Sequence, residues 1–124
     1  MNVSGRKVGP AEVEEALIEH PLVSEAAVIG VPDDVKGEAI VAFVVPRFGA
    51  LFTAESTSDI AAHVVRTLGP TFRPREIRPV PELPKTQSGK VVRRLIRQSY
   101  LEQPLGDLST VANPDALGSF ARSV

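Results

Sequence analysis

Two short apolar stretches separated by a polar turn constrain the fold of this chain most. Residues 24–31 can alternate between two faces of an extended strand, and residues 39–45 are apolar throughout. A short run that is apolar on both faces is typical of a strand covered on both sides. Pro32, Asp33 and Asp34 favour a turn between the two runs. The sequence therefore predicts a β-hairpin with a longish connection, which supplies the best candidates for the core.

The remaining patterns predict three helices and two further short strands around this hairpin. Helices are expected over residues 10–20, 56–68 and 91–102, and short strands over residues 3–8 and 77–80. Gly9 and Pro10 are typical of a helix start, and residues 56–59 carry the small polar side chains that begin helices. The order of elements predicts an α+β domain whose small sheet, of about three strands, is flanked by helices.

The length of 124 residues indicates one domain of ordinary size. We expect that domain to span residues 1–103, with an irregular tail over residues 104–124, where Gly, Ser and Pro are frequent. Chain ends of this composition are usually poorly ordered, so a frayed end is expected at Phe120, with packing of its side chain back onto the domain as the alternative.

The composition argues against several functional classes. Five Phe, one Tyr and no Trp are too few for a platform that stacks nucleic-acid bases, and a net charge of −1 gives no general attraction to nucleic acid or membrane. The chain has no cysteine, and His20 and His63 are too few and too isolated to indicate a metal site, so no metal is expected. No apolar run approaches the roughly 20 residues of a membrane span, and no leader opens the chain. We expect a cytoplasmic protein.

Charge is nevertheless segregated along the chain. The early part is acidic and the later part basic. The residues concerned are Glu12, Glu14, Glu15, Glu19 and Glu25, against Arg73, Arg75, Arg78, Lys85, Lys90, Arg93, Arg94 and Arg97. Two interpretations remain open: two solvated faces, or a basic half that meets a phosphate-bearing ligand.

Residues 84–90, Pro-Lys-Thr-Gln-Ser-Gly-Lys, predict a mobile loop that delivers Lys90 to the start of a basic amphipathic helix. Pro84 ends the preceding element, and Gly89 permits a positive φ beside the lysine. On that helix, Arg93, Arg94 and Arg97 are expected to face away from the apolar side. A P-loop is excluded, because Pro84 and Val91 occupy the places of its required glycine and Ser or Thr. A merely solvated lysine remains an alternative.

This segment resembles the closing lysine motif of the adenylate-forming enzymes: acyl-CoA synthetases, luciferases and the adenylation domains of peptide synthetases. Residues 3–14 and 25–38 are similar to the opening strand and the hairpin of that family's small C-terminal domain. Residues 105–114 resemble the tail of acetyl- and propionyl-CoA synthetases, so the likeness covers about residues 2–117. It implies the C-terminal domain of the acyl-CoA synthetase/luciferase-like fold, with the large N-terminal domain absent.

The resemblance also implies an activity. In the family, a carboxylate reacts with ATP to give an acyl-adenylate, and the acyl group then passes to the thiol of coenzyme A, while the C-terminal domain rotates between the two steps. The chain would thus be the mobile lid domain of a ligase that uses ATP with magnesium and coenzyme A, bound mainly by its own N-terminal domain. The carboxylate is expected to be short, and the isolated domain is expected to be inactive.

Residue roles follow from the same resemblance. Lys90 is assigned to adenylate formation, where its ammonium would lie beside the attacking carboxylate and the α-phosphate. Loop or hinge support is assigned to Gly89, Ser88, Lys36 and Glu38, and coenzyme A binding to Ser4, Gly5, Arg6, Lys7 and Arg66. Two departures weaken the second set: Lys7 stands where acetyl-type enzymes usually carry arginine, and Arg66 lies beside the expected arginine position, which holds Val65.

An exposed Lys90 would also be open to a lysine acetyltransferase and deacetylase, which are the regulatory partners implied here. Two alternatives to the ligase remain. One is a free-standing module whose basic helix binds nucleic acid or other anionic partners, with a steep salt dependence. The other is a small scaffold in which Lys90 has no chemical role.

Overall fold

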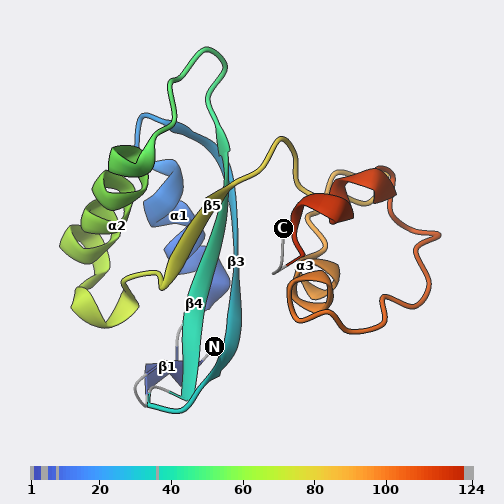
Figure 1. The fold of residues 1–124 in the computed structure, drawn as a ribbon, viewed down its shortest axis with the longest axis horizontal. Coiled ribbons are helices and arrows are strands. Elements are labelled where there is room, and N and C mark those ends of the chain that lie inside the picture. The colour runs from blue at the N-terminus through green and yellow to red at the C-terminus, as the bar shows by residue number, and fades with distance from the viewer. Residues whose placement is uncertain (1, 4–5, 8, 36, 122–124) are drawn as a thin grey trace.

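The computed structural model describes residues 2–3, 6–7, 9–35 and 37–121. Its elements, in chain order, are β1 (Asn2–Val3), β2 (Arg6–Lys7), α1 (Pro10–Ile18), β3 (Val23–Asp33), β4 (Gly37–Pro46), α2 (Ala54–Leu68), the 3-10 turn η1 (Pro70–Phe72), β5 (Glu76–Pro79), α3 (Arg93–Tyr100) and the 3-10 turn η2 (Pro114–Ser119). Figure 1 shows α1 and α2 on one side of the sheet, and α3 with the C-terminal segment on the other. The α+β architecture predicted from the sequence is confirmed.

The predicted hairpin is the centre of the molecule. β3 and β4 pair antiparallel from Ala26 opposite Val44 to Asp33 opposite Gly37. Along most of both strands the residues are buried on both faces. Residues that alternate along a strand point to opposite sides of the sheet, so this ribbon contributes to two separate apolar layers.

The rest of the sheet is built on the other edge of β4. β1 pairs with β4 at Gly37, and β5 runs parallel to β4 further along the strand, after the crossover through α2. The order is β2-β1-β4-β3, with β5 also on β4, which makes five strands. Four strands were predicted along the chain and five are described, because the single strand expected over residues 3–8 consists of two strands of two residues each, paired with one another. All of the described strands join one sheet, which is therefore larger than the sheet of about three strands that was predicted.

Each face of the hairpin has its own core. The face toward α1 and α2 joins Val28, Ala42 and Val44 to Leu17 and Ile60. The opposite face, toward α3, buries a second core. Its residues are Ala27, Ile29, Val31, Ala39, Val41, Phe43, Val80, Leu83, Ile96, Tyr100 and Phe120. Both faces are therefore covered, as the apolar run at residues 39–45 predicted.

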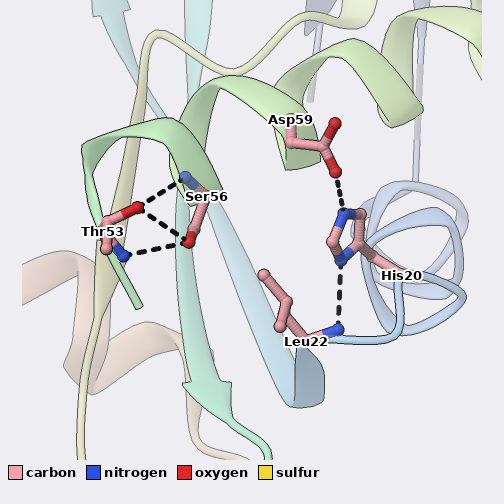
Figure 2. Close-up of polar contacts among 5 residues, drawn as sticks. All are labelled: His20, Leu22, Thr53, Ser56 and Asp59. Atoms are coloured by element: carbon pink, nitrogen blue, oxygen red, sulfur yellow. Dashed lines mark hydrogen bonds and ion pairs between the residues drawn. The ribbon is translucent and has the colours of Figure 1, made fainter. Parts of the chain in front are cut away.

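Polar side chains join the segment just after α1 to α2, as Figure 2 shows. His20 Nδ1 accepts the N–H of Leu22 (3.1 Å), so its Nε2 carries the proton that is donated to Asp59 Oδ2 (2.6 Å). This hydrogen bond holds the pKa of Asp59 below its ordinary value. The rings of His20 and His63 lie 5.9 Å apart, so the prediction that the two histidines are isolated was wrong.

The same view shows why α2 begins earlier than predicted (Figure 2). The first helical residue is Ala54, not residue 56, because Thr53 is the N-cap and accepts the N–H of Ser56 through its hydroxyl. Ser56 in turn accepts the N–H of Thr53 (2.9 Å), which completes a capping box. α1 starts as predicted, with Gly9 as N-cap and Pro10 in the first turn.

The C-terminal segment differs most from its prediction. Phe120 is fully buried, and its ring lies 4.8 Å from that of Phe43. Arg78 also donates a hydrogen bond to the carbonyl of the next residue, Ala121 (2.7 Å). The expectation of a frayed end at Phe120 was therefore wrong, because an aromatic side chain near the end fills the second core. Within the described ranges, no helix combines the length and the apolar character that a membrane span requires.

Candidate functional site

Lys90 lies in a hydrogen-bonded hairpin between β5 and α3. The N–H of Thr86 donates to the carbonyl of Lys90 (2.9 Å), and the N–H of Gly89 donates to the carbonyl of Thr86 (2.9 Å). The N–H of Lys90 donates to the Thr86 hydroxyl (3.2 Å), and Lys85 pairs with Val91 in an antiparallel bridge. The predicted loop is thus a closed turn with its own internal hydrogen bonds.

The tip of this hairpin is exposed. Residues 87–90 are all solvent-exposed, and Gly89 has a φ of +89°, a positive value that a glycine permits at this position. No carboxylate within the described residues forms an ion pair with Lys90. Its ammonium can therefore be presented to a ligand outside this domain.

The arginines that follow Lys90 are arranged differently from the prediction. Arg93 makes a two-pronged ion pair with Glu14 of α1, which raises the pKa of Arg93, and Arg97 Nε donates to the carbonyl of Gly30 in β3 (2.9 Å). Both side chains thus turn toward the domain, and of the three predicted outward arginines only Arg94 is exposed. A basic helix that offers all its charges to an anionic partner is not what the structure contains.

From the sequence, Glu14 was counted only among the acidic residues of the early part, and its structural role was missed. Besides binding Arg93, it accepts the N–H of Val28 (2.9 Å), and it is 7% exposed. It joins α1, β3 and α3, and so attaches the helix that follows Lys90 to the rest of the domain. Its position on the same helix face as Leu17 was the available signal, since a carboxylate at a buried position needs partners.

The residues predicted to contact coenzyme A, and the two predicted to support the β3–β4 turn, are described only in part. Ser4, Gly5 and Lys36 lie outside the described residues. Arg6 and Lys7 form β2, beside β1, which pairs with β4 at Gly37. Glu38 follows in β4, opposite Pro32, and is half-buried. Arg6, Lys7 and Glu38 thus gather at the end of the sheet where β3 turns into β4.

Lys90 belongs to the other end of β3. Lys85, in the same hairpin, forms an ion pair with Glu25 (2.6 Å), near the start of β3, whereas β1 lies beside the turn after Asp33. The strand rises by roughly 26 Å over the eight steps from Glu25 to Asp33. The structure therefore does not bring the lysine hairpin together with Arg6 and Lys7.

Arg66 belongs to a different element, α2. It lies in the last turns of α2, on the face of the sheet opposite α3, and it is exposed near Asp59. The lysine hairpin, the strand pair β1–β2 with the start of β4, and the last turns of α2 thus hold the predicted functional residues. Within the described ranges no group of three or more His, Cys, Asp or Glu side chains is placed to hold a metal ion.

The two-faced α+β fold and the exposed lysine hairpin define the class of small C-terminal domains found in adenylate-forming enzymes. The chain belongs to the family of AMP-binding enzyme C-terminal domains, which its sequence matches over residues 12–90. It is 47% identical to the acetyl-coenzyme A synthetase of Methanothrix soehngenii over 100% of this chain and 18% of that protein. A second acetyl-coenzyme A synthetase, from Streptomyces coelicolor, is 46% identical over 91% of this chain and 17% of its own length. The chain thus spans less than a fifth of these curated relatives.

Solved structures agree with this assignment. The acyl-CoA synthetase of Brucella canis superposes with a TM-score of 0.77 at 46% identity, covering 82% of this chain and 19% of its own. The amide bond synthetase McbA of Marinactinospora thermotolerans gives a TM-score of 0.72 at 37% identity, over 79% of this chain and 20% of its own. Acetoacetyl-CoA synthetase from Streptomyces lividans, at 24% identity, shares the fold over 94% of this chain with a TM-score of 0.79.

Proposed function

We propose that this domain works with a larger ATP- and acyl-binding domain as an AMP-forming ligase. The ligase converts a short carboxylate into an acyl-adenylate and then transfers the acyl group to coenzyme A. The family assignment supports the class of reaction, and the two acetyl-coenzyme A synthetases at 46–47% identity support a short acyl group. ATP, with its magnesium, and the acyl group would be held mainly by the larger domain.

The observation that carries this proposal is the exposed, unpaired ammonium of Lys90 at the tip of a closed hairpin within the described part of the chain. When a carboxylate oxygen attacks the α-phosphorus and the bond to pyrophosphate breaks, negative charge accumulates on the phosphoryl oxygens. A compact positive charge held beside these oxygens stabilises the transition state more than the ground state. An unpaired lysine suits this role because it need not break an ion pair with a carboxylate of its own domain before it contacts the ligand.

Coenzyme A transfer would use a different part of the domain. The strand end with Arg6 and Lys7 lies beside the β3–β4 turn, roughly 26 Å of strand away from the Glu25 end. One domain orientation cannot bring two such distant regions to the same reacting centre. The separation supports a rotation of the domain between the two steps, with Ser4, Gly5, Arg6 and Lys7 facing the thiol acceptor in the second orientation.

The acyl specificity would come from outside this domain. Solved structures that superpose with TM-scores above 0.7 include an anthranilate CoA ligase and an amide bond synthetase. The same small fold thus accompanies different acyl groups and acceptors in those proteins. We therefore assign Lys90 to adenylate formation in general and not to the choice of carboxylate.

The test uses the enzyme that carries this domain, or the Methanothrix soehngenii acetyl-coenzyme A synthetase with this domain in place of its own. In Lys90→Ala, acetate-dependent exchange of pyrophosphate into ATP should fall about 10²–10³-fold, as for the loss of one transition-state charge. Transfer from supplied acetyl-adenylate to coenzyme A should stay near the wild-type rate. Arg94→Ala, which removes an exposed charge from the next helix, is the control and should change neither half-reaction.

Equal losses in both half-reactions of Lys90→Ala, or no loss in either, would contradict the proposal.

Lys90 is also accessible to a lysine acetyltransferase, and acetylation removes the charge on which adenylate formation depends. Protein acetylated at Lys90 should therefore show the same selective loss in the same assay. A deacetylase should then restore pyrophosphate exchange.

A further inference from the structure

The hairpin that carries Lys90 is held from outside by the C-terminal segment. Its first arm runs through Glu82, Leu83 and Lys85, beyond the end of β5 and outside any strand of the main sheet. Opposite this arm, Val111 pairs with Thr86 in an antiparallel bridge. The N–H of Ala112 donates to the carbonyl of Lys85 (2.8 Å). The C-terminal segment thus acts as a neighbouring strand to the hairpin over a few residues.

Asn113 completes this contact with its side chain. Its Oδ1 accepts the N–H of Lys85 (2.8 Å), and its Nδ2 donates to the carbonyl of Leu83 (2.8 Å) and to Glu82 Oε1 (2.6 Å). The amide therefore uses one acceptor and both donors on three residues of a single arm. No other side-chain type of this size offers an acceptor and two donors from one planar group.

The segment that carries Asn113 is itself anchored. Val111 and Leu117 pack with Leu95 of α3, and the Ser99 hydroxyl donates to the carbonyl of Leu117 (3.0 Å). Phe120, fully buried, fixes the end of the segment in the second core. Asn113 therefore connects a firmly packed segment to an exposed turn.

We propose that Asn113 is a positioning residue for Lys90: it fixes the arm of the hairpin and thereby the direction in which the lysine is presented to the acyl-phosphate centre. This inference rests on the proposed function. It goes further in giving the C-terminal segment a part in adenylate formation that its irregular sequence does not suggest. Errors of about 1 Å in the placement of a catalytic group can reduce the rate about 10²-fold, so a loosened hairpin should reduce turnover even though Lys90 itself is unchanged.

The first test measures the hairpin directly, in this chain, without any reaction. In Asn113→Ala, the amide hydrogens of Thr86, Gly89 and Lys90 should exchange at least about 10-fold faster than in the wild type, because the hairpin loses its external hydrogen bonds. Amides in the middle of β4 should keep their exchange rates. Gln103→Ala, a change of the exposed amide side chain ten residues earlier, is the matched control and should leave both sets unchanged.

The second test measures the half-reactions in the chimeric or native ligase. Asn113→Ala should reduce kcat of adenylate formation about 10-fold or more with little change in the KM for ATP, while transfer from supplied acetyl-adenylate stays near the wild-type rate. The exchanged pair Glu82→Gln with Asn113→Asp, which reverses donor and acceptor between these two side chains, should recover part of the loss seen in Asn113→Asp alone. Such rescue is not expected of a residue that only fills space.

The outcomes separate this inference from the proposed function. If Lys90→Ala loses adenylate formation but Asn113→Ala behaves as Gln103→Ala in both tests, the positioning role is wrong and the role of Lys90 stands. If Asn113→Ala reduces both half-reactions equally and exposes β4 amides as well, its role is general stability and the positioning role is again wrong. If Lys90→Ala retains adenylate formation, the proposed function itself fails.

Discussion

At the scale of single residues, Glu14 has a structural role that its neighbours in the sequence do not reveal. It lies among Glu12 and Glu15, yet these two are exposed whereas Glu14 is buried. Its two oxygens accept hydrogen bonds from Arg93 and from the N–H of Val28. A buried carboxylate that receives a guanidinium and a backbone donor stabilises the packing of α1 against β3 and α3.

Glu14→Gln should lower the free energy of unfolding by about 1.5–3 kcal/mol, the usual effect of losing hydrogen bonds to a charged group. The reason is that glutamine offers one acceptor and places an NH₂ group against donors of Arg93 or Val28. Urea unfolding followed by circular dichroism measures the change. Glu15→Gln, one position along and exposed, should stay within about 0.5 kcal/mol of the wild type. Equal stability of the two variants would show that the Glu14–Arg93 pair does not hold α1 and α3 together.

At the scale of elements, the hairpin of residues 84–92 depends on one glycine conformation. Gly89 has a φ of +89°, and a Cβ placed there would meet no atom within 4 Å. A substitution would therefore suffer from backbone strain and not from a clash, at a cost of about 1–2 kcal/mol. Such strain is relieved by opening the turn that presents Lys90.

Gly89→Ala should accordingly reduce acetate-dependent pyrophosphate exchange in the ligase several-fold and leave acyl transfer from acetyl-adenylate unaffected. Gly49→Ala is the matched control, because Gly49 has a similar φ of +80° with equal free space but lies in the loop between β4 and α2. It should show comparable strain in unfolding measurements and normal pyrophosphate exchange. If both variants lost the same activity, the effect would come from lower stability and not from the hairpin.

At the scale of the whole molecule, the C-terminal segment belongs to the folded domain. Phe120 fills the core on the α3 face together with Phe43 and Tyr100, at ring distances of 4.8 Å for Phe43–Phe120 and 6.0 Å for Phe43–Tyr100. The boundary predicted at residue 103 thus divides residues that share one core. Removal of the last segment would expose the apolar face that it covers.

Phe120→Ala should reduce the free energy of unfolding by about 3–5 kcal/mol, as large-to-small changes in aromatic core residues do. Phe48→Ala, at a fully exposed phenylalanine in the loop after β4, should change it by less than about 0.5 kcal/mol. Thermal unfolding of both variants in parallel makes the comparison. A Phe120→Ala protein as stable as Phe48→Ala would mean that the segment folds independently of the core.

Sequence periodicity predicted the parts of the fold that depend on neighbours along the chain. The alternation of β3, the apolar run of β4 and the Gly9–Pro10 start of α1 were confirmed. Gly89 has the positive φ that the sequence permitted. The position of Lys90 at an exposed turn also followed from local sequence, because small polar residues and glycine determine turn geometry over a few residues. These features need no information about distant segments.

Only the tertiary structure decided which distant residues meet. The Glu14–Arg93 pair, the inward direction of Arg97 and the three hydrogen bonds of Asn113 join positions separated by 79, 67 and about 30 residues. No local pattern encodes such pairings, because a polar side chain is buried only where another element brings its partner, and that depends on how the sheet and helices pack. The sequence by itself thus determined that a lysine is exposed beside a glycine turn. The packing of the C-terminal segment decided how that turn is held.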